Sequence, residues 1–404
     1  MIGIRPGLAE IRPLAHLRIH RPMPPRPSSA LLLVASLALL APRGARAEGA
    51  VAYKYSDYRE GGGRVTVETQ TALIEQTIGT DYRARITGTI DAIAGATPTG
   101  EPAPVGSDQV RLAKLTDRRK AWNADLSRQF ARVNVALGLG NSRESDYVSN
   151  GWSLNVLTDF NRKNTILLTG VAGTDDDVKV FFQTPREKKR TNDVIVGLTQ
   201  LLDPQTSVTF NLTYGRYTGF LADPYKLVEK RIEVIPGIFL RQTFSENRPA
   251  EREKAIAFAG LNRALPALNA AIDTSYRYFR DSFGTTAHTL DFNWFQRLGG
   301  KVILRPGFRF YDQSAADFYI YRLDSTPIIP VLRPTADGPF YSSDFRVSAF
   351  RSYNTGLKLI WNPTAALTFD AALERYDMRG RDGVTPASAY IRATIFTLGA
   401  RYAW

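Results

Sequence analysis

Few side chains of this sequence are suited to chemistry. The 404 residues include no cysteine and three histidines, two of which, His16 and His20, lie near the N-terminus. A disulfide, a thiolate metal site and a covalently attached haem are therefore excluded, and so is a multi-histidine metal site.

His288 is the third histidine, and Asp281, Ser282 and Asp291 lie near it in the sequence. A serine, a histidine and a carboxylate are the residue types of a hydrolytic triad. His288 alternates in step with Leu290, however, so it belongs to the apolar side of its segment, where a lipid would be the accessible substrate. A lone histidine at such a position is usually structural. We therefore predict no enzyme and no cofactor, with a lipid hydrolase that uses His288 as the alternative.

The charged residues give no sign of a metal or a nucleic acid. The run Asp175, Asp176 and Asp177 offers carboxylates of the kind that Ca²⁺ prefers, but a solvated hairpin tip explains it better, and we predict no metal site. The formal net charge is +13. Because the basic residues are spread between apolar ones and form no continuous patch, we expect no nucleic acid partner.

The N-terminal segment has the three parts of a secretory signal peptide. Residues 30–41 form an apolar run, Arg18, Arg21 and Arg26 precede it, and Ala45-Arg46-Ala47 provides a small-x-small cleavage site. We predict a signal peptide over residues 1–47, with Met23 as an alternative start, and one mature domain over residues 48–404. The apolar run is too short to span a bilayer as a helix.

The last stretch, residues 388–404, alternates as a strand with two different surroundings. Phe396, Leu398, Tyr402 and Trp404 share one face, and mostly small or polar residues take the other. A terminal aromatic residue preceded by alternating apolar residues is typical of the strand that the barrel-assembly machinery recognises in outer-membrane proteins. We predict that these four residues form this signal and face lipid.

Upstream of this stretch, mostly alternating segments are separated by gaps that are alternately short and long. The predicted strands cover residues 51–58, 64–78, 81–94, 117–126, 130–140, 147–160, 164–173, 194–202, 207–217, 253–265, 267–281, 286–297, 301–311, 343–361, 365–377 and 388–404. If Trp404 is periplasmic, the short gaps are periplasmic turns and the long gaps are extracellular loops, as an outer-membrane barrel requires. The predicted fold is therefore all-β: a single antiparallel transmembrane β-barrel of about 16 strands, with about 14 to 18 as the range.

The strand positions opposite to the apolar ones are predicted to line the lumen. They carry both signs of charge: Arg132, Asp159, Asp273, Arg277, Asp291, Arg305, Arg309, Lys358, Asp370, Glu374 and Arg401. Two interpretations remain. Either the lumen is a water-filled pore with mixed-charge walls, or salt bridges and an inward-folded loop, residues 218–252 or 312–342, close it.

Five arginines alternate with the outward residues instead: Arg216, Arg280, Arg351, Arg375 and Arg392. The predicted topology puts all five toward the extracellular side, where a lipid-facing cation costs only about 0 to 1 kcal/mol. We expect them to bind phosphorylated head groups of the outer leaflet, including lipopolysaccharide, most densely at Arg351, Arg375 and Arg392. Simple extension of these side chains to water is the alternative.

Several motifs resemble an uncharacterised family of bacterial outer-membrane barrels known as a domain of unknown function. They include residues 91–98, 144–149, 223–225, 276–278, 309–319 and 343–346. The resemblance covers nearly all of the mature chain and implies a barrel, but it brings no catalytic position. Most of these motifs lie near the predicted outer rim, where Asp91, Asp146, Asp223, Arg277, Arg309 and Asp317 form either rim hydrogen bonds or a ligand site.

The sequence therefore predicts a porin or transporter of the Gram-negative outer membrane that passes small solutes through a mixed-charge lumen. The alternative from another class is a non-conducting interaction scaffold or surface receptor. Neither the solute nor the oligomeric state follows from the sequence.

Overall fold

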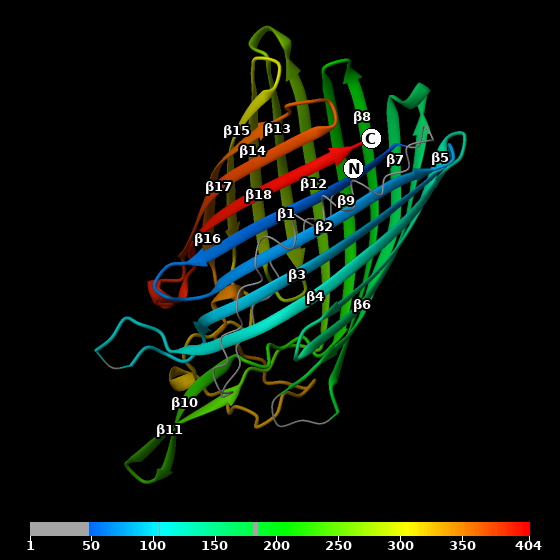
Figure 1. The fold of residues 1–404 in the computed structure, drawn as a ribbon. Coiled ribbons are helices and arrows are strands. Elements are labelled where there is room, and N and C mark those ends of the chain that lie inside the picture. Colours follow the sequence, from blue (N-terminus) through cyan, green and yellow to red (C-terminus); the bar gives the residue numbers. More distant parts are fainter. Residues whose placement is uncertain (1–47, 105, 181–184) are drawn as a thin grey trace.

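The chain folds into a closed β-barrel of sixteen antiparallel strands, with a separate two-stranded hairpin (Figure 1). The computed structural model describes residues 48–104, 106–180 and 185–404. The signal peptide predicted for residues 1–47 lies outside the described residues. The strands follow one another around the wall in chain order, except that β12 pairs with β9, because β10 and β11 form the separate hairpin. The predicted fold class and strand number are confirmed.

The strands are β1 (Gly49–Glu60), β2 (Thr66–Ile78), β3 (Tyr82–Pro98), β4 (Leu112–Gln129), β5 (Val133–Arg143), β6 (Tyr147–Phe160), β7 (Thr165–Val178), β8 (Glu187–Asp203), β9 (Thr206–Gly219), β10 (Leu227–Ile235), β11 (Ile238–Ser245), β12 (Glu251–Leu265), β13 (Ala270–Asp281), β14 (Thr286–Leu298), β15 (Val302–Gln313), β16 (Phe350–Trp361), β17 (Leu367–Gly380) and β18 (Arg392–Ala403). Five short 3₁₀ turns complete the fold: η1 (Asn161–Lys163), η2 (Pro266–Leu268), η3 (Leu323–Ser325), η4 (Phe345–Val347) and η5 (Ala387–Ala389). Among the described residues, no helix is long and apolar enough to cross a membrane.

Alternation along each strand gives the barrel an apolar outer face and a polar inner face. On β9, Phe210, Leu212 and Tyr214 are exposed on the outside, and Asn211 points the other way, in register with Gly197 of β8. Because directly paired residues share a face, the strand register extends this assignment around the barrel.

The connections sort by length to the two ends of the barrel. At one end, the short-turn end, β8 and β9 are joined by only two residues. At the other, the long-loop end, residues 220–250 join β9 to β12 and residues 314–349 join β15 to β16. The first of these loops contains the β10–β11 hairpin, which projects from the barrel (Figure 1). This sorting matches the prediction.

Three strands begin five or more residues away from their predicted starts. β4 begins at Leu112, five residues early, because β3 and β4 stay paired as far as Pro98 and Leu112 beyond the rest of the wall. β8 begins at Glu187 and not at residue 194. β16 begins at Phe350, because the side chain of Asp344 accepts a hydrogen bond from the backbone of Arg346 and caps η4, so residues 343–349 belong to the loop.

The barrel closes where the two ends of the chain meet. β1 pairs with β18 on one side and with β2 on the other. The backbone N–H of Gly49 donates to Trp404 at 3.1 Å, and the N–H of Trp404 donates back to Gly49 at 3.0 Å. Both termini of the described chain therefore lie at the short-turn end (Figure 1).

Candidate functional site

The inner wall carries nearly all of the side chains predicted to line the lumen. The strand register places these on the inner face: Asp159, Asp273, Arg277, Asp291, Arg305, Arg309, Lys358, Asp370, Glu374 and Arg401. Arg132 is a correction, because it lies in the turn between β4 and β5. There it is exposed, and its carbonyl accepts the N–H of Asp159 at 2.8 Å.

Opposite charges pair along this wall. The Nζ of Lys358 lies 2.8 Å from the Oδ2 of Asp370, and the Nη1 of Arg309 lies 3.5 Å from the Oδ1 of Asp291. Glu374 accepts a hydrogen bond from Asn354 at 2.6 Å. These pairs hold the charged groups against the wall.

Glycines opposite the polar residues make this arrangement possible. Asp370 lies over Gly399 of β18, and Asn211 lies over Gly197 of β8. A Cβ atom at either glycine would overlap the polar side chain. The polar groups therefore lie flat along the wall. This pattern was not predicted from the sequence, although a strand register derived from alternation pairs the two residue types.

A second inner cluster, also overlooked, surrounds Glu75 of β2. Its carboxylate lies 2.5 Å from Arg83, 3.5 Å from Arg85 and 3.8 Å from Arg401. One buried acid thus pairs with three arginines from two strands, two of them on β3 and one on β18. No signal along a single strand reveals such a cluster, because it depends on side-chain reach.

The lumen has a recess at the short-turn end. Its volume is about 740 Å³, and its walls include Asn262, Asp273, Phe295, Arg297 and Ile303. The turns that connect β8 to β9 and β12 to β13 form its outer edge. The short-turn end therefore combines accessible space with polar side chains.

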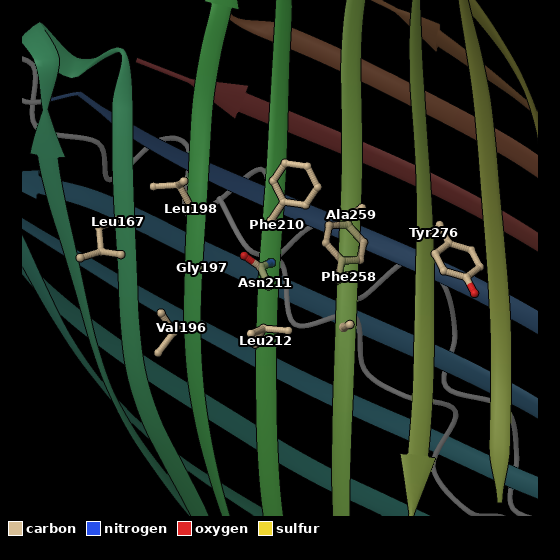
Figure 2. Close-up of a pocket in the computed structure, with 11 residues that line it drawn as sticks. Leu167, Val196, Gly197, Leu198, Phe210, Asn211, Leu212, Phe258, Ala259 and Tyr276 are labelled. Atoms are coloured by element: carbon tan, nitrogen blue, oxygen red, sulfur yellow. The ribbon is translucent and has the colours of Figure 1, made fainter.

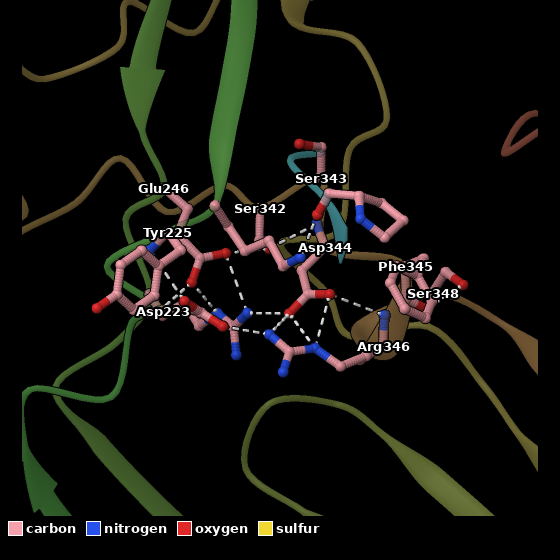
Figure 3. A network of polar contacts seen from close by, with 12 residues as sticks. Asp223, Tyr225, Glu246, Ser342, Ser343, Asp344, Phe345, Arg346 and Ser348 are labelled. Carbon is pink, nitrogen blue, oxygen red and sulfur yellow. Dashed lines mark hydrogen bonds and ion pairs between the residues drawn. The ribbon is translucent and has the colours of Figure 1, made fainter. Parts of the chain in front are cut away.

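The long-loop end is built differently. Residues 220–250 and 314–349, which we call the loop cover, meet there around a buried group of charges. This charge cluster consists of the buried residues Asp223, Lys226, Glu246, Arg248 and Asp344 and the half-buried Arg346. Figure 3 labels Asp223, Glu246, Asp344 and Arg346 of this cluster. Arg248 lies 2.8 Å from Glu246 and 2.8 Å from Asp344, and Arg346 lies 2.6 Å from Asp344. Arg346 also pairs with Asp223, which joins the two loops.

The loop cover is tied to distant parts of the rim. Lys226 donates to the carbonyl of Pro98 at the end of β3, and the N–H of Leu227 donates to Thr99 at 2.9 Å. Five strands lie between β9, where this loop begins, and β3. The hydroxyl of Tyr225 donates to Asp146 in the turn between β5 and β6. These contacts carry the loop across the mouth of the barrel.

Apolar packing anchors the second loop. Phe345 of η4 packs in a buried group with Val110, Phe350, Met378 and Tyr390. Its ring meets that of Tyr390 edge-on, with the centroids 6.1 Å apart. Because Met378 lies on the inner face of β17, this part of the loop cover lies inside the mouth.

Burial sets the charge states of the cluster. It lowers the pKa of Lys226 and raises the pKa of Glu246 to about 7. Burial also acts to raise the pKa of Asp344, but Arg346, Lys226 and Arg248 outweigh it and hold that pKa below its usual value. Asp344 is therefore the fixed anion of the cluster, and Glu246 is the group that titrates near neutral pH.

The rim residues of the sequence motifs take part in separate contacts. Asp91 pairs with Arg119 at 2.5 Å, and Tyr225 links Asp146 to Asp223, because its N–H donates to Asp223 at 2.9 Å. Arg309 pairs within the lumen, and Arg277 lies on the inner face of β13. The N–H of Asp317 donates to the carbonyl of Phe283. These contacts correspond to rim and wall hydrogen bonds.

His288 does not meet the other residue types of a triad. It lies on the outer face of β14, where its Nδ1 is 2.6 Å from the hydroxyl of Tyr276. Asp291 lies on the inner face, and the carboxylate of Asp281 binds Arg252. The hydroxyl of Ser282 accepts the N–H of Glu253. The geometry therefore gives no support to a hydrolase that uses His288.

The five outward arginines lie on the outer face toward the long-loop end. Four of them have local partners: Arg216 pairs with Glu251 at 3.1 Å, Arg351 with Asp312 at 2.5 Å, and Arg392 with Asp377 at 3.4 Å, and Arg375 donates to Thr394 at 3.0 Å. Arg280 stands between Ala255 and Thr286 in the register. The acids reduce the positive charge available to a lipid phosphate at β15 to β18.

Phe396, Leu398 and Tyr402 share the outer face of β18, and the ring of Trp404 lies 5.9 Å from that of Tyr402. A shallow apolar groove of about 350 Å³ also lies on the outer face, over β7, β8, β9, β12 and β13 (Figure 2). Phe210, Leu212 and Tyr276 stand beside Ala257 and Ala259 there. This groove is separate from the lumen.

Comparison with known proteins supports the family resemblance. A family model described as "Protein of unknown function (DUF3570)" matches residues 111–186 and 181–389. No curated protein matches the chain.

Among solved structures, the chain is similar to the ferric enterobactin receptor PfeA and the siderophore receptor PirA of Pseudomonas aeruginosa and to the outer membrane protein OmpT of Vibrio cholerae. The PfeA match has 11% identity and a TM-score of 0.44, and it covers 84% of this chain and 54% of the receptor. The PirA match has 11% identity and a TM-score of 0.42, and it covers 89% of this chain and 61% of the receptor. The OmpT match has 9% identity and a TM-score of 0.42, and it covers 89% of this chain and 97% of OmpT. The chain thus spans less than two thirds of the length of either siderophore receptor.

Proposed function

Because this chain belongs to the DUF3570 family, for which no function is known, we propose its function from the geometry: it is an outer-membrane barrel that passes small solutes through a mixed-charge lumen and that the loop cover closes at rest. The short-turn end is then periplasmic and the long-loop end extracellular. The apolar outer face, the even strand number and the sorting of the loops support this location.

The strand number supports a pathway through the barrel. Barrels of sixteen strands leave an aqueous channel unless something occupies it. Here the paired charges lie flat against glycines, which keeps the wall side chains out of the centre. Since both signs of charge line the wall, we expect weak selectivity between cations and anions.

The observation that carries the proposal is the charge cluster that joins the two loops across the extracellular mouth. Buried ion pairs cost desolvation energy, and their mutual attraction repays that cost only when the geometry is good. When the loops separate, each charged group regains water. Ion pairs therefore fix the closed arrangement in one geometry and still allow it to open, which an apolar core of the same size would resist.

Conductance of the purified protein in planar bilayers tests the proposal. The double substitution Asp344→Asn and Arg346→Gln removes the contacts to Arg248 and Asp223 that hold the two loops together. We expect rare openings for the native protein and steady conductance for the variant. The matched control is Arg241→Gln, which removes a pair with Glu229 at 3.2 Å in the β10–β11 hairpin, outside the charge cluster, and should behave like the native protein.

Silent bilayers from the double variant, with a barrel that still shows heat-dependent mobility in gels, would refute a solute pathway. They would favour the second candidate, a surface receptor. That candidate is supported by the hairpin, where Val234, Ile235, Ile238, Phe239 and Leu240 are all at least half exposed. Apolar residues gathered outside the membrane segment typically mark an interaction site.

A further inference from the structure

A group of cations on the outer face of β4 and β5 lies outside the sites described so far. Arg118 and Lys120 are on β4 and Arg143 is on β5, and all three are exposed. They alternate in step with Trp122 and Leu139, which are 47% and 61% exposed, so they face outward. We call these three residues the β4–β5 cation patch.

The register places two of these cations directly opposite each other, because Lys120 pairs with Arg143. Like charges in directly opposed positions destabilise a sheet. Within the part of the chain that the structure describes, no acid is within ion-pair distance of any member of the patch. The arginines at β16 to β18 differ, since Asp312 and Asp377 accompany them. An anion from outside the chain would relieve the repulsion in the patch.

The patch lies at the level of the outer-leaflet head groups. Near the periplasmic end of β4, Arg128 lies 5.0 Å from the ring centroid of Tyr82 and 4.7 Å from that of Phe130. Arg118 comes ten residues earlier on the same strand. A strand tilted by about 45° rises roughly 2.3 Å per residue along the membrane normal, so the two arginines are separated by about the 25 Å of the apolar band.

An apolar surface continues from the patch toward the membrane centre. Trp122, Leu126, Leu137, Leu139 and Trp152 are all exposed on the outer face of β4, β5 and β6. Trp152 is the register partner of Leu139. A lipid whose phosphate met the cations would place its acyl chains along this surface.

We propose that the β4–β5 cation patch is a binding site for lipopolysaccharide. Its lipid phosphates would lie between Arg118, Lys120 and Arg143, and its acyl chains would pack against Trp122 and Leu139. The planar guanidinium of an arginine holds a phosphate through two parallel hydrogen bonds, and the lysine adds a point charge. The residues predicted for this role were Arg351, Arg375 and Arg392. Acids lie beside Arg351 and Arg392, however, so the positive charge that lacks an acidic partner is at β4 and β5. The proposal does not depend on the lumen conducting.

The test measures lipopolysaccharide binding to the full-length protein in mild detergent. Arg118→Gln, Lys120→Gln and Arg143→Gln are combined in one variant, and Arg351→Gln, Arg375→Gln and Arg392→Gln in a matched control of equal charge change. Purified diphosphorylated lipid A and the same lipid A without phosphates are the probes. We expect the first variant to bind the diphosphorylated lipid at least about tenfold more weakly, which corresponds to about 1.4 kcal/mol, and the control to bind like the native protein.

Equal binding by the first variant and the native protein would overturn the proposal. A loss confined to the control would overturn it too and would place the head-group site at β16 to β18. If the native protein bound both lipids equally, the acyl chains alone would account for binding and the phosphate site would be refuted. Inorganic phosphate at the same concentration should not compete, because it lacks the acyl chains.

Discussion

At the residue scale, Glu246 gives the loop cover a dependence on pH. Its carboxylate is fully buried beside Arg248 and accepts the hydroxyl of Ser342 at 2.5 Å. Burial raises its pKa from 4.5 to about 7, so the protonated form favours the closed cover. The contribution of Glu246 to the stability of the closed cover is complete below pH 4.5 and is lost as the pH rises to about 7.

We predict that amide hydrogens of residues 220–250 exchange faster at pH 8 than at pH 5, after correction for intrinsic exchange rates. A ratio of about tenfold or more is expected from a shift of this size. Glu246→Gln should keep the slower rate at both pH values, since the amide carries no charge. A native protein with the same corrected rate at both pH values would contradict this.

Residue contacts were only partly predictable from the sequence. Alternation assigned Asp370 and Lys358 to the inner face, since side-chain direction along a strand is a local property. The pairing of Arg346 with Asp223 was not predictable, because the two lie on irregular loops far apart in the chain. Arg132 was misplaced because the predicted strand began in what is a turn.

At the element scale, the last strand both closes the barrel and ends at Trp404. Deleting Trp404 removes both hydrogen bonds to Gly49 and the ring beside Tyr402. We predict that the truncated protein inserts severalfold less efficiently, since an unpaired strand edge in lipid leaves backbone groups unsatisfied. The measurement is the folded fraction by heat-dependent gel mobility.

Trp404→Phe serves as the control for this prediction. It keeps the backbone bonds and a terminal aromatic ring, so its insertion should be close to native. Native insertion by the truncated protein would show that neither the seam bonds nor the terminal ring is needed.

The start of β4 and the β10–β11 hairpin were not predicted from the sequence. Residues 112–116 at the start of β4 were not predicted as strand, because Leu112 and Leu115 point to opposite faces and apolar and polar residues do not alternate there. The β10–β11 hairpin was assigned to a loop, although Pro236-Gly237 lies at its turn. Residues 233–243, around its tip, are exposed on both faces, so the apolar–polar alternation of the wall strands has no reason to continue through them.

At the scale of the whole molecule, the two ends of the lumen differ in access. The chain has no cysteine, so a single introduced thiol reports on one position. Ser153 lies on the inner face of β6, opposite Gly138. We predict that Ser153→Cys reacts slowly with a small sulfonated maleimide in sealed proteoliposomes whose extracellular loops face outward, and quickly once detergent opens the vesicles.

Val384→Cys, in the exposed loop between β17 and β18, should react quickly in both conditions and serves as the control. Combining Ser153→Cys with the Asp344→Asn and Arg346→Gln substitutions should remove the difference. Fast reaction of Ser153→Cys in sealed vesicles with the native cover would mean that the loops do not block the mouth.

The strand number and the sorting of the loops were predictable because each depends on a pattern repeated sixteen times around the wall. A wrong boundary on one strand does not change such a count. The loop cover occurs once, and its form depends on how two irregular segments meet, which no periodicity encodes.

The seam between β1 and β18 also determines the order of assembly. These strands stand almost the full length of the described chain apart, so their pairing is the contact of longest sequence separation in the barrel. Forming it carries the largest loop-closure entropy, and topologies dominated by such contacts fold slowly. Because β18 is also the last strand to be synthesised, every earlier stage has at least two unpaired strand edges. Until this twelve-residue strand pairs with β1, the two open edges can pair with other chains.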